Sequence, residues 1–161
     1  MNRAAQLGQI IKGKPVADHL LERLGAEIAA LNDQGFNPRL AVIRVGERPD
    51  HIAYKRNALR KCESVGLTAD SRILPENIGE NALVAEIQNI NRDKSIHGVL
   101  LLMPLPGHLD SKAITHALAP GKDMDCLTPV NVSKLMEGEA SGFYPCTPMA
   151  VIEMLKFYNV P

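Results

Sequence analysis

The stretch GERPDHIAYKRNALRKCESVGL, residues 46–67, decides the fold, because it leads from an apolar strand into an amphipathic helix. The run Leu40–Val45 precedes it and is rich in the branched residues that favour strands. Pro49 suits the first position of a helix, where no backbone N–H is needed. Gly66 suits the position just after a helix, where a positive φ is required. The sequence therefore predicts a strand over 40–45 and a helix over about 49–65.

The two sides of this helix have different expected roles. At about 100° per residue, Ile52, Leu59 and Cys62 fall in one arc, which we expect to face a core. Tyr54 and Ala58 fall together at the edge of that arc, where a helix borders a cleft. The helix is thus expected to bear both on the core and on a ligand site.

Strands and helices alternate over most of the remaining chain. Apolar runs or alternation predict strands over 6–11, 67–74 and 96–103, the second with Ala69, Ser71 and Ile73 on one face. Helical spacing predicts helices over 15–35, around 83–90, and over 110–118, the last capped by Asp110. Alternation of this kind is typical of right-handed crossovers and a mostly parallel sheet. We expect a three-layer α/β/α fold.

The pattern breaks between residues 121 and 146, which read as loop with one short helix near 132–136. Thr147 is then expected to cap a last helix, with Pro148 at its first position. Its apolar stripe, Val151, Ile152, Leu155 and Tyr158, is expected to be incompletely covered. The sequence thus divides into a domain over 1–146 and a helix over 147–161.

Composition excludes several classes of partner. The 161 residues, 45% apolar, suffice for one domain with a real core. Eighteen basic residues balance eighteen acidic ones, and aromatic content is 4%, which argues against nucleic acid and membrane partners. No apolar run is long enough for a membrane span, the start lacks a secretory signal, and three cysteines form no disulfide framework. These features favour a cytoplasmic protein.

Candidate site residues lie where the strands end, because open parallel sheets bind ligands there. Tyr54 either handles a proton or stacks on a ring, or it is an amphipathic packing residue. Asp123 and Asp125 either bind a cation or heterocycle, or are locally hydrogen-bonded. Between them in space we place the rigid turn Met103–Pro106, where one X–Pro bond can be cis.

Other reactive residues give weaker signals. Cys146 would lie at a helix N-terminus, which favours a thiolate, but no paired base is evident. There is no G-x-G-x-x-G and no Walker-type loop, so no nucleotide fingerprint. The histidines show no metal spacing and are read as structural or surface residues: His19, His51, His97, His108 and His116.

Four segments in fixed order resemble one family: VGERPDHIAYKRNALRKCESVGL, HGVLLLMPLP, GKDMDCLTPVNVSKLMEG and FYPCTPMAVIEML. The resemblance, from about Ile11 onward, is to the amino-terminal catalytic domain of bifunctional methylenetetrahydrofolate dehydrogenase/methenyltetrahydrofolate cyclohydrolase. It implies a folate cleft and one-carbon chemistry, with NADP or NAD as cofactor of the full-length enzyme. Tyr54 matches the family's Tyr and would stack on the folate. Asp125 matches the Asp that would hold the pterin edge, and Pro104 belongs to the family's PLP turn.

The sequence departs from this family at several positions. The Lys of its Tyr-x-x-x-Lys pair is Ala58, and the Gln of its V-Q-L-P-L-P turn is Leu102. The Gly after the Asp is Cys126, and a small polar residue usual three before the Tyr is His51. Ala58 has no titratable group, so the family's cyclohydrolase proton transfer cannot be done from there. The departures therefore predict lost cyclohydrolase activity with a retained folate cleft. Lys61 is on the correct face of the helix but one turn too far along.

The family's nucleotide-binding Rossmann domain would begin just after Pro161. We accordingly expect this chain to bind no NAD(P) itself and to be inactive in isolation. A homodimer is possible, since the family is usually dimeric through its second domain. Alternatives are a non-catalytic folate- or pterin-binding module, a regulatory partner of an intact homologue, or a dehydrogenase with an altered one-carbon substrate.

Overall fold

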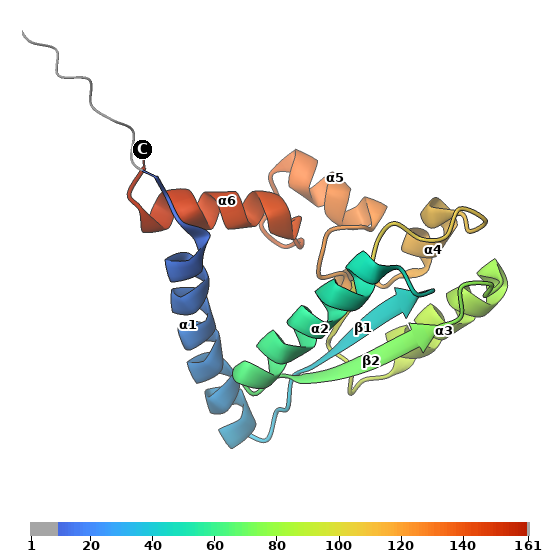
Figure 1. The fold of residues 1–161 in the computed structure, drawn as a ribbon, viewed down its shortest axis with the longest axis horizontal. Helices are drawn as coiled ribbons and strands as arrows, with labels where there is room; N and C mark the ends of the chain where they lie inside the picture. The colour runs from blue at the N-terminus through green and yellow to red at the C-terminus, as the bar shows by residue number, and fades with distance from the viewer. Residues whose placement is uncertain (1–9, 161) are drawn as a thin grey trace, which may run out of the picture.

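The computed structural model describes residues 10–160. Strands and helices alternate through the first two thirds of this range (Figure 1). No helix within it is long and apolar enough to cross a membrane. The elements are α1 (Gly13–Asp33), β1 (Arg39–Val45), α2 (Pro49–Ser64), β2 (Thr68–Leu74), α3 (Glu80–Arg92), β3 (Gly98–Leu101), α4 (Ser111–Ala117), a 3-10 turn η1 (Pro120–Lys122), α5 (Pro129–Glu137) and α6 (Cys146–Phe157).

The strands form one parallel sheet in the order β2-β1-β3. In the register, Ile43 of β1 lies beside Arg72 of β2 and Leu101 of β3. The parallel α/β architecture predicted from the sequence is therefore confirmed. Parallel strands place all their carboxyl ends at one edge of the sheet, which is where a ligand site is expected.

The two faces of the sheet differ. Alternate residues of β1, namely Ala41, Ile43 and Val45, join the main hydrophobic core with residues of α3 and α4. The intervening residues Val42 and Arg44 point to the other face, because successive side chains of a strand alternate. Helix α2 lies over that second face (Figure 1). The fold thus has a closed face under α3 and α4 and an α2 face, names that we keep below.

Several local predictions are confirmed. Helix α2 begins at Pro49, and Gly66 adopts φ +76 after its end. Helix α3 buries the three residues that marked it: Leu83, Ile87 and Ile90. The side chain of Asp110 accepts from the backbone N–H of Lys112 and caps α4. The short helix expected near 132–136 is longer, because Thr128 caps it and Pro129 begins it. The turn η1 was not predicted.

Other predictions are wrong. Ile52 is 40% exposed, and its neighbour His51 is buried instead, whereas Cys62 of the same predicted arc is buried as expected. Ile73 is also exposed, because β2 is an edge strand whose Leu74, not Ile73, packs on the core. Ile10 and Ile11 form no strand, and the rest of the strand expected over 6–11 lies outside the described residues.

The last helix begins earlier than predicted. Helix α6 starts at Cys146 with Pro145 at the cap position, so Thr147 lies inside the helix and caps nothing. The apolar stripe of α6 is incompletely covered, as expected, since Val151 and Ile152 are exposed. Its far end meets α1 (Figure 1), where the Tyr158 hydroxyl donates to the Lys12 carbonyl at 3.0 Å.

Candidate functional site

A cleft of about 310 Å³ opens on the α2 face, beside the carboxyl end of β3. The first turns of α2, the end of β3 with the turn after it, and the loop before α5 all contribute to it, as the sequence predicted. Helix α6 adds one residue. The lining residues are Asp50, His51, Tyr54, Leu100, Leu101, Leu102, Met103, Asp125 and Thr147.

Tyr54 presents its ring to this cleft and is 56% exposed. Burial of part of the side chain, and then the negative charge of Asp125, raise the pKa of the phenol above its usual value. The hydroxyl is therefore protonated at neutral pH and is a poor base. More than half of the Tyr54 side chain is thus accessible at the cleft.

The two aspartates of one loop have different environments. Asp123 is fully buried and accepts from the backbone N–H groups of Leu127 and Thr128 and from the Asn131 amide, at 2.8–2.9 Å. Burial alone would raise its pKa, but these hydrogen bonds outweigh it and lower the pKa. Asp123 therefore holds the loop together. Of the two roles considered from the sequence, ligand binding and local hydrogen bonding, it has the second. Asp125 lines the cleft.

Asp125 also caps α6. Its Oδ1 accepts from the backbone N–H of Cys146 at 3.0 Å, the type of contact that satisfies the free donors of a helix start. The second carboxylate oxygen is not used in this bond. A carboxylate fixed in this way at the cleft wall is ready to accept further N–H groups from a ligand.

The thiolate expected at Cys146 is corrected by the structure. Burial, followed by the charge of Asp125, raises the pKa of this thiol to about 11. The Cys146 sulfur lies 3.4 Å from the Met124 carbonyl oxygen, to which a thiol can donate. The favourable field of a helix start is thus overcome by burial, with the neighbouring carboxylate adding to the effect, and Cys146 is protonated at neutral pH.

His51 is a site residue that the sequence reading missed as such. It is buried, lines the cleft, and its Nε2 lies 3.0 Å from the Met103 carbonyl oxygen. A carbonyl can only accept, so Nε2 carries the proton and donates. The contact ties α2 to the turn after β3, next to the Met103–Pro104 peptide bond, which is cis. His51 lies three residues before Tyr54 on the same side of the helix, and this spacing could have identified it as a residue that lines the cleft.

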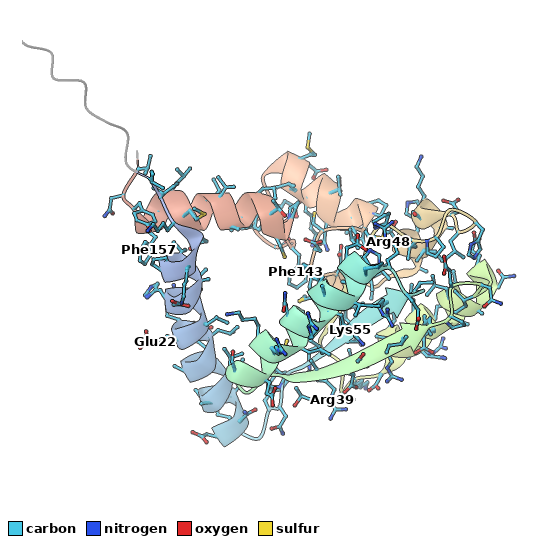
Figure 2. The ribbon with its side chains drawn as sticks, in the orientation of Figure 1. Glu22, Arg39, Arg48, Lys55, Phe143 and Phe157 are labelled. Carbon is cyan, nitrogen blue, oxygen red and sulfur yellow. The ribbon has the colours of Figure 1, made fainter. Side chains whose placement is uncertain are left out.

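Of the two positions that depart from the family's Lys and Gln, Leu102 lines the cleft and Ala58 does not. Leu102 is buried in its wall. Ala58 is half-buried and Pro104 exposed, and neither is among the lining residues. Lys55 does not replace the missing Lys, since its Nζ donates to Ser71 Oγ of β2 at 2.9 Å; Figure 2 labels Lys55 on α2. The lining of the cleft therefore has two carboxylates, an imidazole and a phenol but no lysine.

Neither a metal cluster nor a free phosphate-binding turn is found among the described residues. Within residues 10–160, no group of three or more His, Cys, Asp or Glu side chains is arranged to hold a metal ion. The β1–α2 turn, where dinucleotide folds bind pyrophosphate, carries Asp50 at the start of α2. Asp50 is paired with Arg48 at 2.7 Å, and its Oδ1 accepts from the backbone N–H of His51 at 3.0 Å. A backbone donor that would face a phosphate in this turn is therefore already used.

Comparisons with known proteins identify the family of the chain. The family described as "Tetrahydrofolate dehydrogenase/cyclohydrolase, catalytic domain" matches residues 11–125. A bifunctional protein FolD of Clostridioides difficile is 47% identical over 153 residues, which are 95% of this chain and 53% of that protein. The chain spans about half the length of the curated relatives it matches.

Solved structures show the same relationship. The bifunctional FolD dehydrogenase/cyclohydrolase of Campylobacter jejuni superposes with a TM-score of 0.92 at 36% identity, over 94% of this chain and 54% of that one. The Trypanosoma brucei enzyme, solved with NADP cofactor and inhibitor, gives 0.89 at 34% identity, over 95% and 52%. The chain belongs to the tetrahydrofolate dehydrogenase/cyclohydrolase family and corresponds to its catalytic domain.

Proposed function

We propose that the cleft between Tyr54 and Asp125 binds a tetrahydrofolate-type ligand. The observation that carries the proposal is that these residues, far apart in sequence, line one cleft at the carboxyl edge of the sheet. Asp125 accepts from the amide and amino N–H groups of a pterin, because a carboxylate offers two acceptor oxygens. Tyr54 stacks on the ring. Leu102 gives the wall an apolar surface, and Pro104 shapes the turn behind it.

The same cleft supports a narrower reaction than the family's double activity. Cyclohydrolase chemistry needs a group that moves a proton near the one-carbon bridge, and the lining residues offer neither lysine nor glutamine. We infer that cyclohydrolase activity is lost, while methylenetetrahydrofolate oxidation is retained by the protein in which this domain acts. That reaction depends mainly on holding folate in position against a nicotinamide.

NADP or NAD is the cofactor expected for that oxidation, and it is a proposal for a longer protein. In this proposal, the chain contributes the folate side of the reaction. Residues 1–146 then form the folate domain, and 147–161 lead toward the nucleotide-binding part. Cytoplasmic location and a homodimer are part of the same proposal.

The test is a calorimetric titration of the chain with tetrahydrofolate. Asp125→Asn removes the charge but keeps an acceptor that can cap α6, and we expect it to weaken binding at least about tenfold. Asp70→Asn, on the edge strand, is the matched control and should bind as the wild type does. Equal binding by Asp125→Asn and wild type would exclude Asp125 from the site. Absence of binding by the wild type would refute the folate cleft.

A further inference from the structure

Arg44 is a buried cation that none of the roles above uses. The residue is 5% exposed, and its Nε and Nη1 atoms have no hydrogen-bond partner within residues 10–160. No ion pair of Arg44 with a carboxylate is found in that range either. Charged side chains are almost never buried this deeply unless they are paired. The position therefore calls for an explanation.

The sheet register places Arg44 next to the cleft. Leu102 follows Leu101, the β3 partner of Ile43, and its backbone N–H donates to the Ile43 carbonyl at 3.0 Å. Arg44 is thus the cross-strand neighbour of Leu102, about 4.8 Å away between strands. Leu102 lines the cleft, and an arginine side chain is longer than that spacing. The guanidinium can therefore reach the cleft wall beside Leu102.

The positive charge of Arg44 acts on a residue of the α2 face. Burial, and then the positive charge of Arg44, lower the pKa of Lys55, which belongs to α2. Arg44 alternates with Ile43 and Val45, the residues that face the closed core, so it points away from that core. Both observations place the guanidinium in the layer between the sheet and α2, on the same side as Tyr54 and Leu102.

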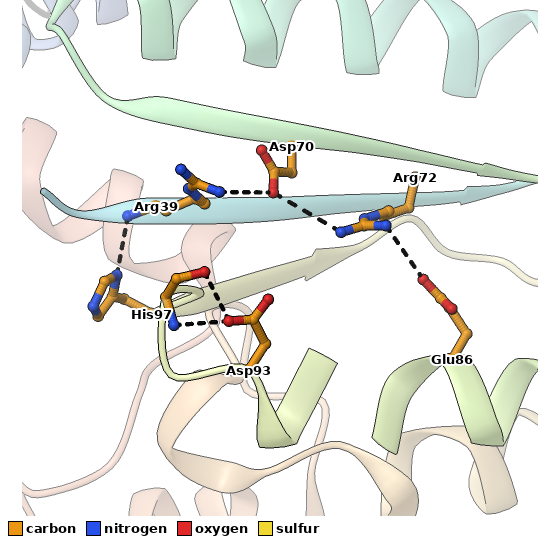
Figure 3. Close-up of polar contacts among 7 residues, drawn as sticks. Arg39, Asp70, Arg72, Glu86, Asp93 and His97 are labelled. Carbon is orange, nitrogen blue, oxygen red and sulfur yellow. Dashed lines mark hydrogen bonds and ion pairs between the residues drawn. The ribbon is translucent and has the colours of Figure 1, made fainter. Parts of the chain in front are cut away.

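A second arginine shows what a structural role looks like in this fold. Arg72 of β2 also has a buried Nε without a partner, but its guanidinium is paired with Asp70 at 4.0 Å and Glu86 at 3.9 Å (Figure 3). It has carboxylates on both sides and lies at the edge of the sheet. Arg44 has the burial without the carboxylates. Removing water from a charge without pairing it is unfavourable, so Arg44 lacks an acceptor that Arg72 has.

A guanidinium has five N–H donors and no acceptor, so the partner that Arg44 lacks must supply an acceptor atom. We infer that Arg44 is a specificity-determining residue of the cleft, whose guanidinium donates to a carbonyl or carboxylate oxygen of the bound ligand beside Leu102. The inference rests on the proposed folate cleft. Arg44 of β1 would then supply a positive charge to the cleft. The cleft otherwise lacks the family's lysine and glutamine, because those positions are Ala58 and Leu102.

The test measures stability and binding separately. Arg44→Met removes the charge and keeps an unbranched apolar chain, while Arg72→Met is the matched control on the paired arginine. We expect Arg44→Met to raise the melting temperature of the free chain by about 2–6 °C, because a buried unpaired charge is lost. It should weaken tetrahydrofolate binding at least about tenfold. Arg72→Met should lower the melting temperature and leave binding within about twofold.

Two ligands identify the oxygen. If tetrahydrofolate and 6-methyltetrahydropterin, which lacks the glutamate tail, lose affinity equally in Arg44→Met, the acceptor is the ring carbonyl. Loss with tetrahydrofolate alone assigns a tail carboxylate. If Arg44→Met does not fold, Arg44→Lys keeps the charge without the fork and should still weaken binding about threefold or more.

The inference would be overturned by Arg44→Met binding as tightly as wild type while Asp125→Asn binds weakly. In that case the folate cleft stands and Arg44 has no part in it. Absence of binding by the wild type refutes the cleft itself, and the inference with it.

Discussion

The two faces of the sheet carry an arginine each, in opposite circumstances. Arg72 lies between Asp70 and Glu86 on the side of α3 (Figure 3). Arg44, one strand away on the α2 face, is more deeply buried and has no carboxylate partner within the described residues. The closed face pairs its arginine with two carboxylates, although one Nε stays without a partner, whereas the α2 face leaves Arg44 without a carboxylate. A face with unsatisfied polar groups beside a cleft is arranged for a ligand at the expense of stability.

Asp123 and Asp125 repeat the contrast at a spacing of two residues. Asp123 uses its oxygens on its own loop, and Asp125 keeps one oxygen beyond its helix-capping bond for the cleft. The same residue type therefore stabilises at one position and is available for recognition at the other. The predictions below test whether stability and binding really separate in this way.

The largest expected effect lies on the closed face. Leu83 is fully buried in the core cluster, so Leu83→Ala should lower the free energy of unfolding by about 2–5 kcal/mol through lost burial and a cavity. Leu100, half-buried at the cleft, is the matched control, and Leu100→Ala should cost less than about half as much. Urea unfolding of the three forms measures both. Equal losses would contradict the division between the faces.

The buried aspartate gives the next largest effect. Asp123→Asn should lower the free energy of unfolding by about 1.5–3 kcal/mol, because charge-assisted hydrogen bonds are weakened inside the protein. Asp125→Asn should cost less than about 1 kcal/mol, since one half-exposed helix cap is changed. Chemical unfolding at pH 7 compares the two variants, and a larger loss at Asp125 would reverse their roles.

The effect at Asp123 depends on pH in a defined direction. Its pKa is depressed in the folded chain below the usual 3.8, so the unfolded state binds its proton first as the pH falls. The stability that Asp123 contributes is present above the unfolded pKa and is lost as pH falls through the folded value. The difference between wild type and Asp123→Asn should therefore shrink below about pH 4. A constant difference down to pH 2 would exclude this ionisation as the cause.

A smaller, catalytic effect is expected from restoring the family residues. Ala58→Lys with Leu102→Gln puts a titratable amine and an amide back at their family positions. The rate of methenyltetrahydrofolate hydrolysis should rise by about tenfold or more over the wild type. The absorbance of the substrate measures this rate. Ala58→Met with Leu102→Gln controls for side-chain size. Wild-type hydrolysis already at the level of the restored variant would disprove the loss of this activity.

The smallest effect concerns Cys146, which is exposed yet protonated. With its thiol pKa raised to about 11, alkylation by iodoacetamide at pH 7.5 should be roughly tenfold slower than for an unperturbed thiol or more. Asp125→Asn should speed the reaction, because the neighbouring negative charge is gone. Mass spectrometry assigns the label to Cys146 rather than to the buried Cys62 and Cys126. A faster reaction than that of a model thiol would contradict the assigned environment.

Much of the fold is predictable because local signals agree with one another. Pro49 and Gly66 bound α2, and the spacing of Leu83, Ile87 and Ile90 identifies the buried side of α3. The misses occur where a distant contact decides the outcome. Ile52 gives way to His51, whose ring reaches Met103 more than fifty residues away.

The site shows the same limit. Tyr54, Leu102 and Asp125 were identified from the resemblance, and the structure brings all three to one cleft. Arg44 escaped notice because it sits inside an apolar run, where an alternating pattern does not reveal whether a charge has a partner. The helix position of Cys146 favours a thiolate, whereas burial and the carboxylate of Asp125, twenty-one residues earlier, keep the thiol protonated. The periodicity of a sequence does not show which charges from distant segments will lie beside a residue.

A tetrahydrofolate titration monitored by amide chemical shifts of the 15N-labelled chain compares the two faces of the sheet in one experiment. We expect shifts concentrated at His51, Tyr54, Leu102 and Asp125, with those of Arg72, Glu86 and Asn89 unchanged. Shifts centred on the α3 side of the sheet, or none at saturating ligand, would contradict this expectation.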